Sequence, residues 1–118
     1  MRPSLETLHG QPSYSIRSDA VEAHVTQTAG MLGPVTFTLG KKKVSPFSVA
    51  PWALNGETIE KGLPPLLHAL RGDFFCLPFG GNETPYRGEK HPPHGETANS
   101  RWSGRKLTSR NGIHELHL

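Results

Sequence analysis

The sequence of 118 residues contains one cysteine, Cys76, and no long apolar run. A single thiol excludes an internal disulfide framework and is typical of proteins from a reducing compartment. No apolar run approaches the roughly 18–20 residues that a membrane-spanning helix needs. The residues after Met1 carry one arginine and no apolar stretch, unlike a secretory signal. We therefore expect a soluble, cytoplasmic protein with no membrane partner.

The sequence also lacks a strong excess of charge of one sign. Lys and Arg number 13, Asp and Glu number 10, and the formal net charge is +3. The only basic run is Lys41-Lys42-Lys43, which predicts a solvated turn rather than a phosphate-binding patch. Nucleic-acid-binding domains usually show a clustered basic stripe, so we expect no nucleic-acid partner. A Gly-rich phosphate loop, a G-x-S-x-G motif and a cysteine pair are all missing, and the sequence predicts no cofactor.

Helix-compatible segments are scarce as well. The 13 glycines and 11 prolines interrupt helices, which disfavours a helical bundle. The length is enough for one domain and too small for two. Segments with alternating apolar and polar residues are typical of half-buried strands, and they predict an all-β fold. The expected strands are 14–17, 21–28, 35–39 and, interrupted by prolines, 44–53.

The remaining segments are predicted to be irregular or cut short. Residues 1–13 form a lead-in, 54–65 a loop, 66–70 one helical turn and 72–93 a long irregular stretch. Residues 113–118 are half apolar up to the last position. Because domains rarely stop inside an apolar-patterned element, we expect residues 1–118 to be the N-terminal portion of one larger domain.

Residues 71–102 interleave aromatic side chains with polar ones. Aromatic faces pack on the C–H side of a sugar ring, while planar polar groups hydrogen-bond its hydroxyls, so this segment is a candidate sugar site. The alternative is an ordinary surface loop in which Phe74, Phe75 and Phe79 are core anchors. Cys76, between two apolar neighbours, is expected to be buried and inert.

Histidines in this segment allow two further interpretations. His94 precedes Gly95, and a neutral imidazole suits general acid–base chemistry near pH 7. His91 and His94 have the H-x-x-H spacing, with Glu96 following, so a divalent metal site is an alternative. Against it, the intervening Pro92-Pro93 favours an extended backbone that separates the two rings. The isolated residues His9, His24 and His68 are expected to be surface or satisfied core residues.

The order of motifs in this segment resembles the galactose mutarotase-like superfamily of aldose 1-epimerases, most closely the branch that contains hexose-6-phosphate mutarotase-like proteins. The motifs are Arg71-Gly72, Leu77-Pro78-Phe79-Gly80, Pro92-Pro93-His94-Gly95 and Ala98-Asn99-Ser100-Arg101-Trp102. The resemblance spans about 32 residues, and extends more weakly over residues 14–118. It covers about the first third of a family chain.

The resemblance implies part of a β-supersandwich with a sugar cleft. Family enzymes interconvert sugar anomers by opening the ring: a carboxylate takes a proton from the anomeric hydroxyl while a histidine protonates the ring oxygen. By the motif, His94 corresponds to a catalytic histidine and Arg71 to a substrate-binding arginine. Asn82, Asn99 and Trp102 are further predicted substrate-binding residues.

The sequence departs from the family pattern at two places. Asp73 replaces a small residue, and Glu96-Thr97 replaces a pair that often contains arginine, so phosphosugar specificity does not carry over. The second family histidine and the catalytic glutamate have no counterpart here. We therefore expect a carbohydrate-binding, aldose 1-epimerase-like protein with a hexose ligand, inactive as these 118 residues alone. The alternative is a non-catalytic sugar-binding or interaction module of the same fold, and uncovered strand edges favour self-association.

Overall fold

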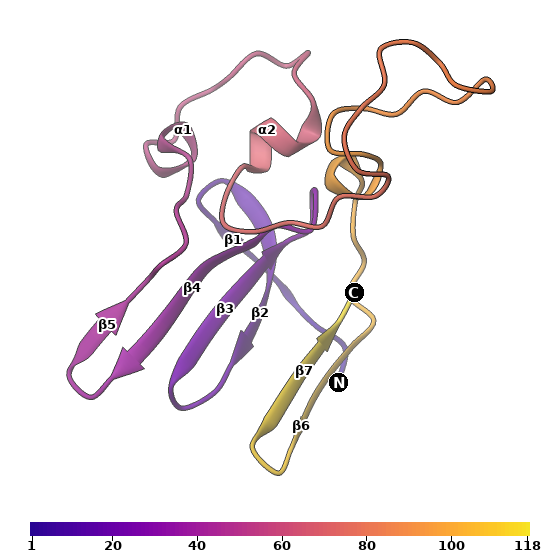
Figure 1. Cartoon of the computed structure of the whole chain (residues 1–118). Helices are drawn as coiled ribbons and strands as arrows, with labels where there is room; N and C mark the ends of the chain where they lie inside the picture. Colours follow the sequence, from indigo (N-terminus) through magenta and orange to yellow (C-terminus); the bar gives the residue numbers. More distant parts are fainter.

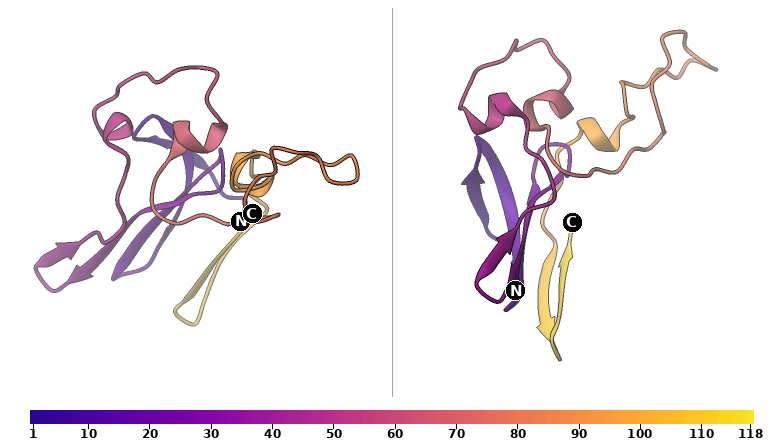
Figure 2. Two further views of the ribbon diagram at one scale, coloured as in Figure 1. Left: turned by 45° about the horizontal axis from the view of Figure 1, so that its top comes forward. Right: turned by 60° about the vertical axis from the view of Figure 1, so that its left-hand side comes forward.

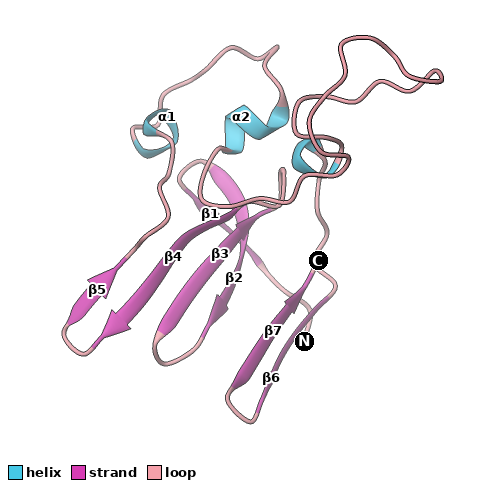
Figure 3. Cartoon of the chain, viewed as in Figure 1, coloured by secondary structure: helices cyan, strands magenta, loops and turns pink.

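The computed structural model describes all 118 residues and is mainly β, with 40% of residues in strands or bridges and 10% in helices (Figures 1 and 3). An antiparallel sheet of five strands has the order β1-β2-β3-β4-β5, and β6 and β7 form a separate hairpin. The all-β class predicted from the sequence is therefore confirmed. The strands are β1 (Leu5–Leu8), β2 (Gln11–Arg17), β3 (Val21–Thr26), β4 (Leu32–Leu39), β5 (Lys42–Val44), β6 (Lys106–Arg110) and β7 (Ile113–His117).

Short turns with left-handed backbone conformations connect two of the strand pairs. His9 and Gly10 join β1 to β2 with φ angles of 47° and 74°, and Asn111 and Gly112 join β6 to β7 with 53° and 76°. Positive φ at both central residues is the requirement of a type I′ turn, which matches the twist of antiparallel strands. Each turn therefore fixes the register of its hairpin.

The five-stranded sheet has one apolar and one polar face, as alternation along each strand requires. Ile16 pairs with Ala23, and Ala23 with Val35, so these side chains share the apolar face. The hairpin β6–β7 lies beside one face of the sheet, and β7 packs against β2 (Figure 2). Phe37 and Leu39 of β4 remain exposed.

A group of four charged or titratable side chains occupies the polar face. Arg17 Nη2 lies 3.1 Å from Glu6 Oε1 and 2.9 Å from Glu22 Oε1, and His24 Nε2 lies 3.2 Å and 3.4 Å from the same two oxygens. The hydroxyl of Ser15, with smaller contributions from the charges of Arg17 and His24, holds the pKa of Glu6 below its ordinary value. His24 is buried, and its Nδ1 has no hydrogen-bond partner.

The helices are short and cover one end of the sheet. They are α1 (Pro51–Leu54), α2 (Pro65–Ala69) and a 3₁₀ turn, η1 (Thr97–Asn99). The main core cluster joins α2 to the β3–β4 connection through Ala29, Met31, Leu66 and Ala69. No helix is long and apolar enough to cross a membrane.

The molecule is open for its size. Only 14 residues are buried, and the accessible surface is 8099 Å². A compact monomer of 12.9 kDa would expose about 6,300 Å². The radius of gyration is 15.8 Å, against about 13.5 Å for a compact domain of this length. Large hydrophobic residues such as Leu39, Phe79 and Ile113 are exposed on this open surface.

Several local predictions are wrong. The lead-in 1–13 contains β1 and the start of β2, because Arg71, far along the chain, fixes the turn between them. Residues 44–53 contain the end of β5 and α1 instead of a strand, since Pro51 occupies the first turn of a helix. Strand β6 was not predicted. The helical turn, the long irregular stretch and the strands around 14–17, 21–28 and 35–39 are confirmed with shifted ends.

Candidate functional site

Arg71, a predicted substrate-binding residue, is directed into the protein. Its side chain is buried, with 2% of the residue exposed. Nε donates to the carbonyl of Ala69 at 2.8 Å, Nη1 to that of Leu8 at 2.9 Å and Nη2 to that of His9 at 2.9 Å. No carboxylate pairs with the guanidinium, and burial lowers the pKa of Arg71. Arg71 thus joins the end of α2 to the β1–β2 turn.

Asn99 connects the turn that contains His94 and Gly95 to α2 through hydrogen bonds. Its Nδ2 donates to the carbonyls of Pro93 at 2.8 Å and Gly95 at 2.9 Å, and its Oδ1 accepts from the amide of Leu66 at 3.4 Å. The structure therefore brings Asn99 next to His94 in space. The polar atoms of the Asn99 side chain are engaged in holding this turn.

Two of the motif glycines, Gly72 and Gly95, lie where the backbone closely approaches another segment of the chain. Gly72 has a φ of 54°, and a Cβ added there would overlap the carbonyl oxygen of Leu32. Gly95 has a φ of 80°, and its Cβ would overlap the carbonyl of Pro78. Both positions thus require glycine for packing as well as for conformation.

Asn82 organises the loop that projects from the molecule at the upper right of Figure 1. Its Nδ2 donates to the carbonyls of Thr84 at 3.1 Å and Glu89 at 2.8 Å, and its Oδ1 accepts from the amide of His91 at 2.7 Å. Two shallow cavities, of about 420 and 210 Å³, flank Asn82. The side-chain amide is occupied by the loop itself.

Trp102 anchors the end of the segment. Its indole N–H donates to the carbonyl of Thr97 at 2.9 Å, and its backbone N–H donates to that of Gln27 at 2.7 Å. A Cβ on Gly30 would lie 2.6 Å from the indole Cε2, so the ring covers this glycine closely. Trp102 therefore links η1 to the β3–β4 connection.

His94 is the predicted site residue whose ring is exposed. Its ring meets Phe74 edge-on with centroids 5.4 Å apart, and Nδ1 lies 3.7 Å from Cys76 Sγ. The prediction of a buried Cys76 is wrong, because the thiol is only partly covered. Phe75 and Phe79 are 57% and 90% exposed, so they are not core anchors, whereas Phe74 packs against the core cluster.

His91 is engaged differently from His94. Its Nδ1 lies 3.1 Å from Glu96 Oε1 and its Nε2 lies 3.6 Å from Glu89 Oε2. No group of three or more His, Cys, Asp or Glu side chains could hold a metal ion. The structure therefore gives the metal alternative no ligand set.

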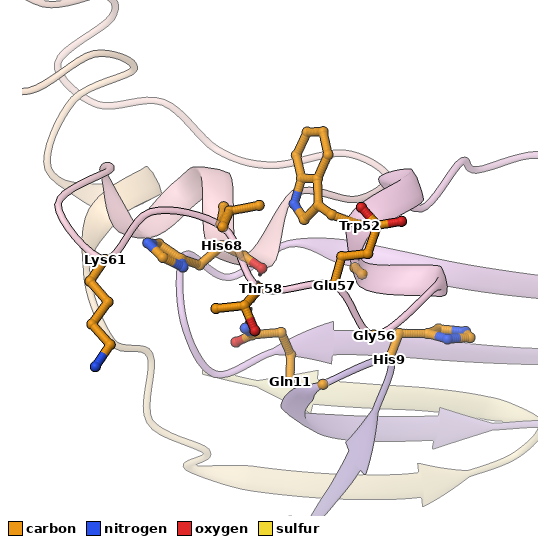
Figure 4. Close-up of a pocket in the computed structure, with 11 residues that line it drawn as sticks. His9, Gln11, Trp52, Gly56, Glu57, Thr58, Lys61 and His68 are labelled. Atoms are coloured by element: carbon orange, nitrogen blue, oxygen red, sulfur yellow. Dashed lines mark hydrogen bonds between the residues drawn. The ribbon is translucent and has the colours of Figure 1, made fainter.

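A cavity of about 290 Å³ that the sequence did not predict lies between the β1–β2 turn and the α1–α2 connection (Figure 4). Its polar lining includes His9, Gln11, Glu57, Thr58, Lys61 and His68. In Figure 4, Gln11, Thr58 and His68 lie between Lys61 on one side and Glu57 and His9 on the other. Sequence reasoning missed this pocket because its residues come from three separate segments with no characteristic spacing.

The segment 71–102 thus combines one exposed imidazole with four residues whose polar groups bind the backbone. Comparisons of the chain with models of protein families, with curated proteins and with solved structures find no match.

Proposed function

We propose that this chain is a carbohydrate-binding protein of the aldose 1-epimerase type, with a hexose as its ligand. His94 is the proposed acid–base residue, which would protonate the ring oxygen of the sugar. The observation that carries the proposal is the exposed His94 ring in a turn fixed by Asn99. A general acid needs an accessible ring nitrogen and a defined orientation, and an exposed residue in a turn held by hydrogen bonds supports this role.

The same proposal includes the finer fold, part of a β-supersandwich in a mutarotase-like domain. Two observations support it: the sheet has an apolar face, and the separate β6–β7 hairpin packs against β2. The exposed Phe37 and Leu39 are consistent with a layer that extends further than this hairpin.

The predicted substrate contacts of Arg71, Asn82, Asn99 and Trp102 stay predictions. In the structure the hydrogen-bonding groups of these side chains contact the backbone, so a holding role is the one that their geometry supports. These residues would contribute to sugar binding indirectly, by keeping the loops around His94 in place.

A non-catalytic sugar-binding module is the second candidate. It is favoured by the surroundings of His94, which contacts Phe74 and Cys76 and has no carboxylate in an ion pair. Ring opening by the family mechanism requires both an acid and a base. A chain with the imidazole alone would bind the sugar without exchanging its anomers.

Two-dimensional NMR exchange spectroscopy of D-glucose and D-galactose with the protein tests both candidates. Binding that weakens in His94→Ala, but not in the control His117→Ala on the exposed side of β7, supports a sugar site at His94. Faster anomer exchange that is lost in His94→Ala supports the epimerase, and binding without exchange supports the module. Hexose signals unaffected by the protein would overturn both.

A further inference from the structure

The pocket beside the β1–β2 turn has one wall that hydrogen bonds within the protein hold in place. Arg71 holds the carbonyls of Leu8 and His9, and Gln11 Nε2 donates to the carbonyl of His68 at 3.3 Å. Across the pocket, the indole N–H of Trp52 donates to the carbonyl of Leu67 at 3.0 Å. These bonds connect the turn, α1 and α2 on one side of the pocket, and the amide of Glu57 donates to the carbonyl of Trp52 at 2.8 Å at the start of the α1–α2 connection. This part of the wall is therefore held before any ligand binds.

The polar groups of this pocket that make no hydrogen bond within the protein include both donors and acceptors. Gln11 Oε1, the Thr58 hydroxyl and Glu57 Oε2 make no hydrogen bond within the protein. The same holds for the ring nitrogens of His9 and His68 and for the ammonium of Lys61, which is not in an ion pair. Trp52, Ala53 and Ile59 supply the apolar part of the lining.

This combination selects the chemistry of a ligand. Glu57 and Lys61 carry opposite charges, so the fixed charges of the lining balance, and a strongly charged ligand gains little. A ligand rich in hydroxyl groups both donates and accepts at short range, and its C–H groups can meet an apolar wall. The volume of about 290 Å³ is just below the roughly 300–1,000 Å³ typical of small-molecule sites, so it suits a ligand with a single ring.

We propose that this pocket is a binding site for a neutral monosaccharide, separate from the His94 segment. Thr58, Glu57 and Gln11 Oε1 would hydrogen-bond the hydroxyl groups. His9 and His68 would each hydrogen-bond a hydroxyl group through a ring nitrogen. The inference does not depend on His94 or on catalysis.

A matched pair of double variants tests the proposal. Glu57→Ala/Thr58→Val removes two polar groups from the pocket, and both residues are exposed, so the fold is retained. Glu83→Ala/Thr84→Val makes the same change in the projecting loop next to Asn82. Binding of D-glucose and D-galactose is followed by the backbone amide shifts of each protein, with thermal unfolding as the check on folding.

The expected result is a loss of about tenfold in hexose affinity in the first double variant, as two lost hydrogen bonds imply. Shifts at Gly10 and Gln11 are expected to need about tenfold more hexose in this variant than in the parent protein, and His94→Ala is expected to leave them unchanged. An undiminished affinity in a folded first variant would overturn the proposal. So would a loss confined to the Glu83→Ala/Thr84→Val protein or to His94→Ala, which would place the sugar on the 71–102 segment and support the proposed function alone.

Discussion

Replacing Arg71 with methionine is expected to destabilise the fold strongly. Methionine keeps most of the apolar stem but removes the donors that hold the carbonyls of Ala69, Leu8 and His9. A buried acceptor left without a donor costs about 1–3 kcal/mol. The bond to Ala69 is buried, while those to Leu8 and His9 are only partly buried, so water replaces part of the loss.

We therefore expect Arg71→Met to lower the free energy of unfolding by about 3 kcal/mol. This is a large share of the roughly 6–18 kcal/mol typical of a domain of this length. Urea unfolding followed by the fluorescence of Trp52 and Trp102 measures the change. The control is Arg105→Met, at an exposed side chain without hydrogen bonds or ion pairs, where a change within about 0.5 kcal/mol is expected. An Arg71→Met protein within about 1 kcal/mol of the parent would refute the view that this guanidinium holds the β1–β2 turn.

Three further predictions concern packing, pH and assembly. Gly95→Ala should unfold at a clearly lower temperature than Gly88→Ala, because both glycines have a φ near 80° but only at Gly95 would the new methyl group overlap the backbone; equal melting temperatures would contradict the packing. The lowered pKa of Glu6 in the folded protein means that its ionised form stabilises the fold above the ordinary pKa of glutamate and that this stability is lost as the pH falls toward the lowered value. The melting temperature of Glu6→Gln should therefore lie below that of the parent near pH 6, and the two values should converge as the pH falls. A difference that stays constant with pH would argue against a stabilising role of the Glu6 charge. Analytical ultracentrifugation should show species larger than 12.9 kDa, since the excess surface of about 1,800 Å² exceeds the roughly 800 Å² that each partner buries in a stable interface; a monomer at all concentrations would contradict this.

The strands of the sheet could be predicted where apolar and polar residues alternate. Val21, Ala23 and Val25 share one face of β3, as the alternation predicts. The pattern did not reveal that these three residues are only half-buried, whereas His24 and Thr26 on the other face are buried. The strand β1 has exposed residues over most of its length and could not be predicted from its pattern. Its position depends on Arg71, a contact across more than 60 residues.

The candidate site was predictable in outline only. The motif placed glycine at positions 72 and 95, and the structure shows that both are needed for packing against a nearby carbonyl, which the sequence alone did not indicate. The family resemblance implied that Arg71 contacts a substrate, and Asn82 and Asn99 were predicted beside it, whereas the side chains of all three bind backbone carbonyls of the protein. Which carbonyl needs a donor depends on tertiary contacts, and a pattern of residue types does not contain that information.

The most direct test of the central claim is a titration of the isotope-labelled protein with D-galactose and D-glucose, followed through its backbone amides. We predict saturable shifts of the backbone amides around His94, in the turn that Asn99 holds. These shifts are expected in addition to those at the pocket that Gln11 and Thr58 line. The same shifts should be absent in His94→Ala and present in His117→Ala. A spectrum that stays unchanged around His94 at saturating hexose would contradict the claim that this segment binds a sugar.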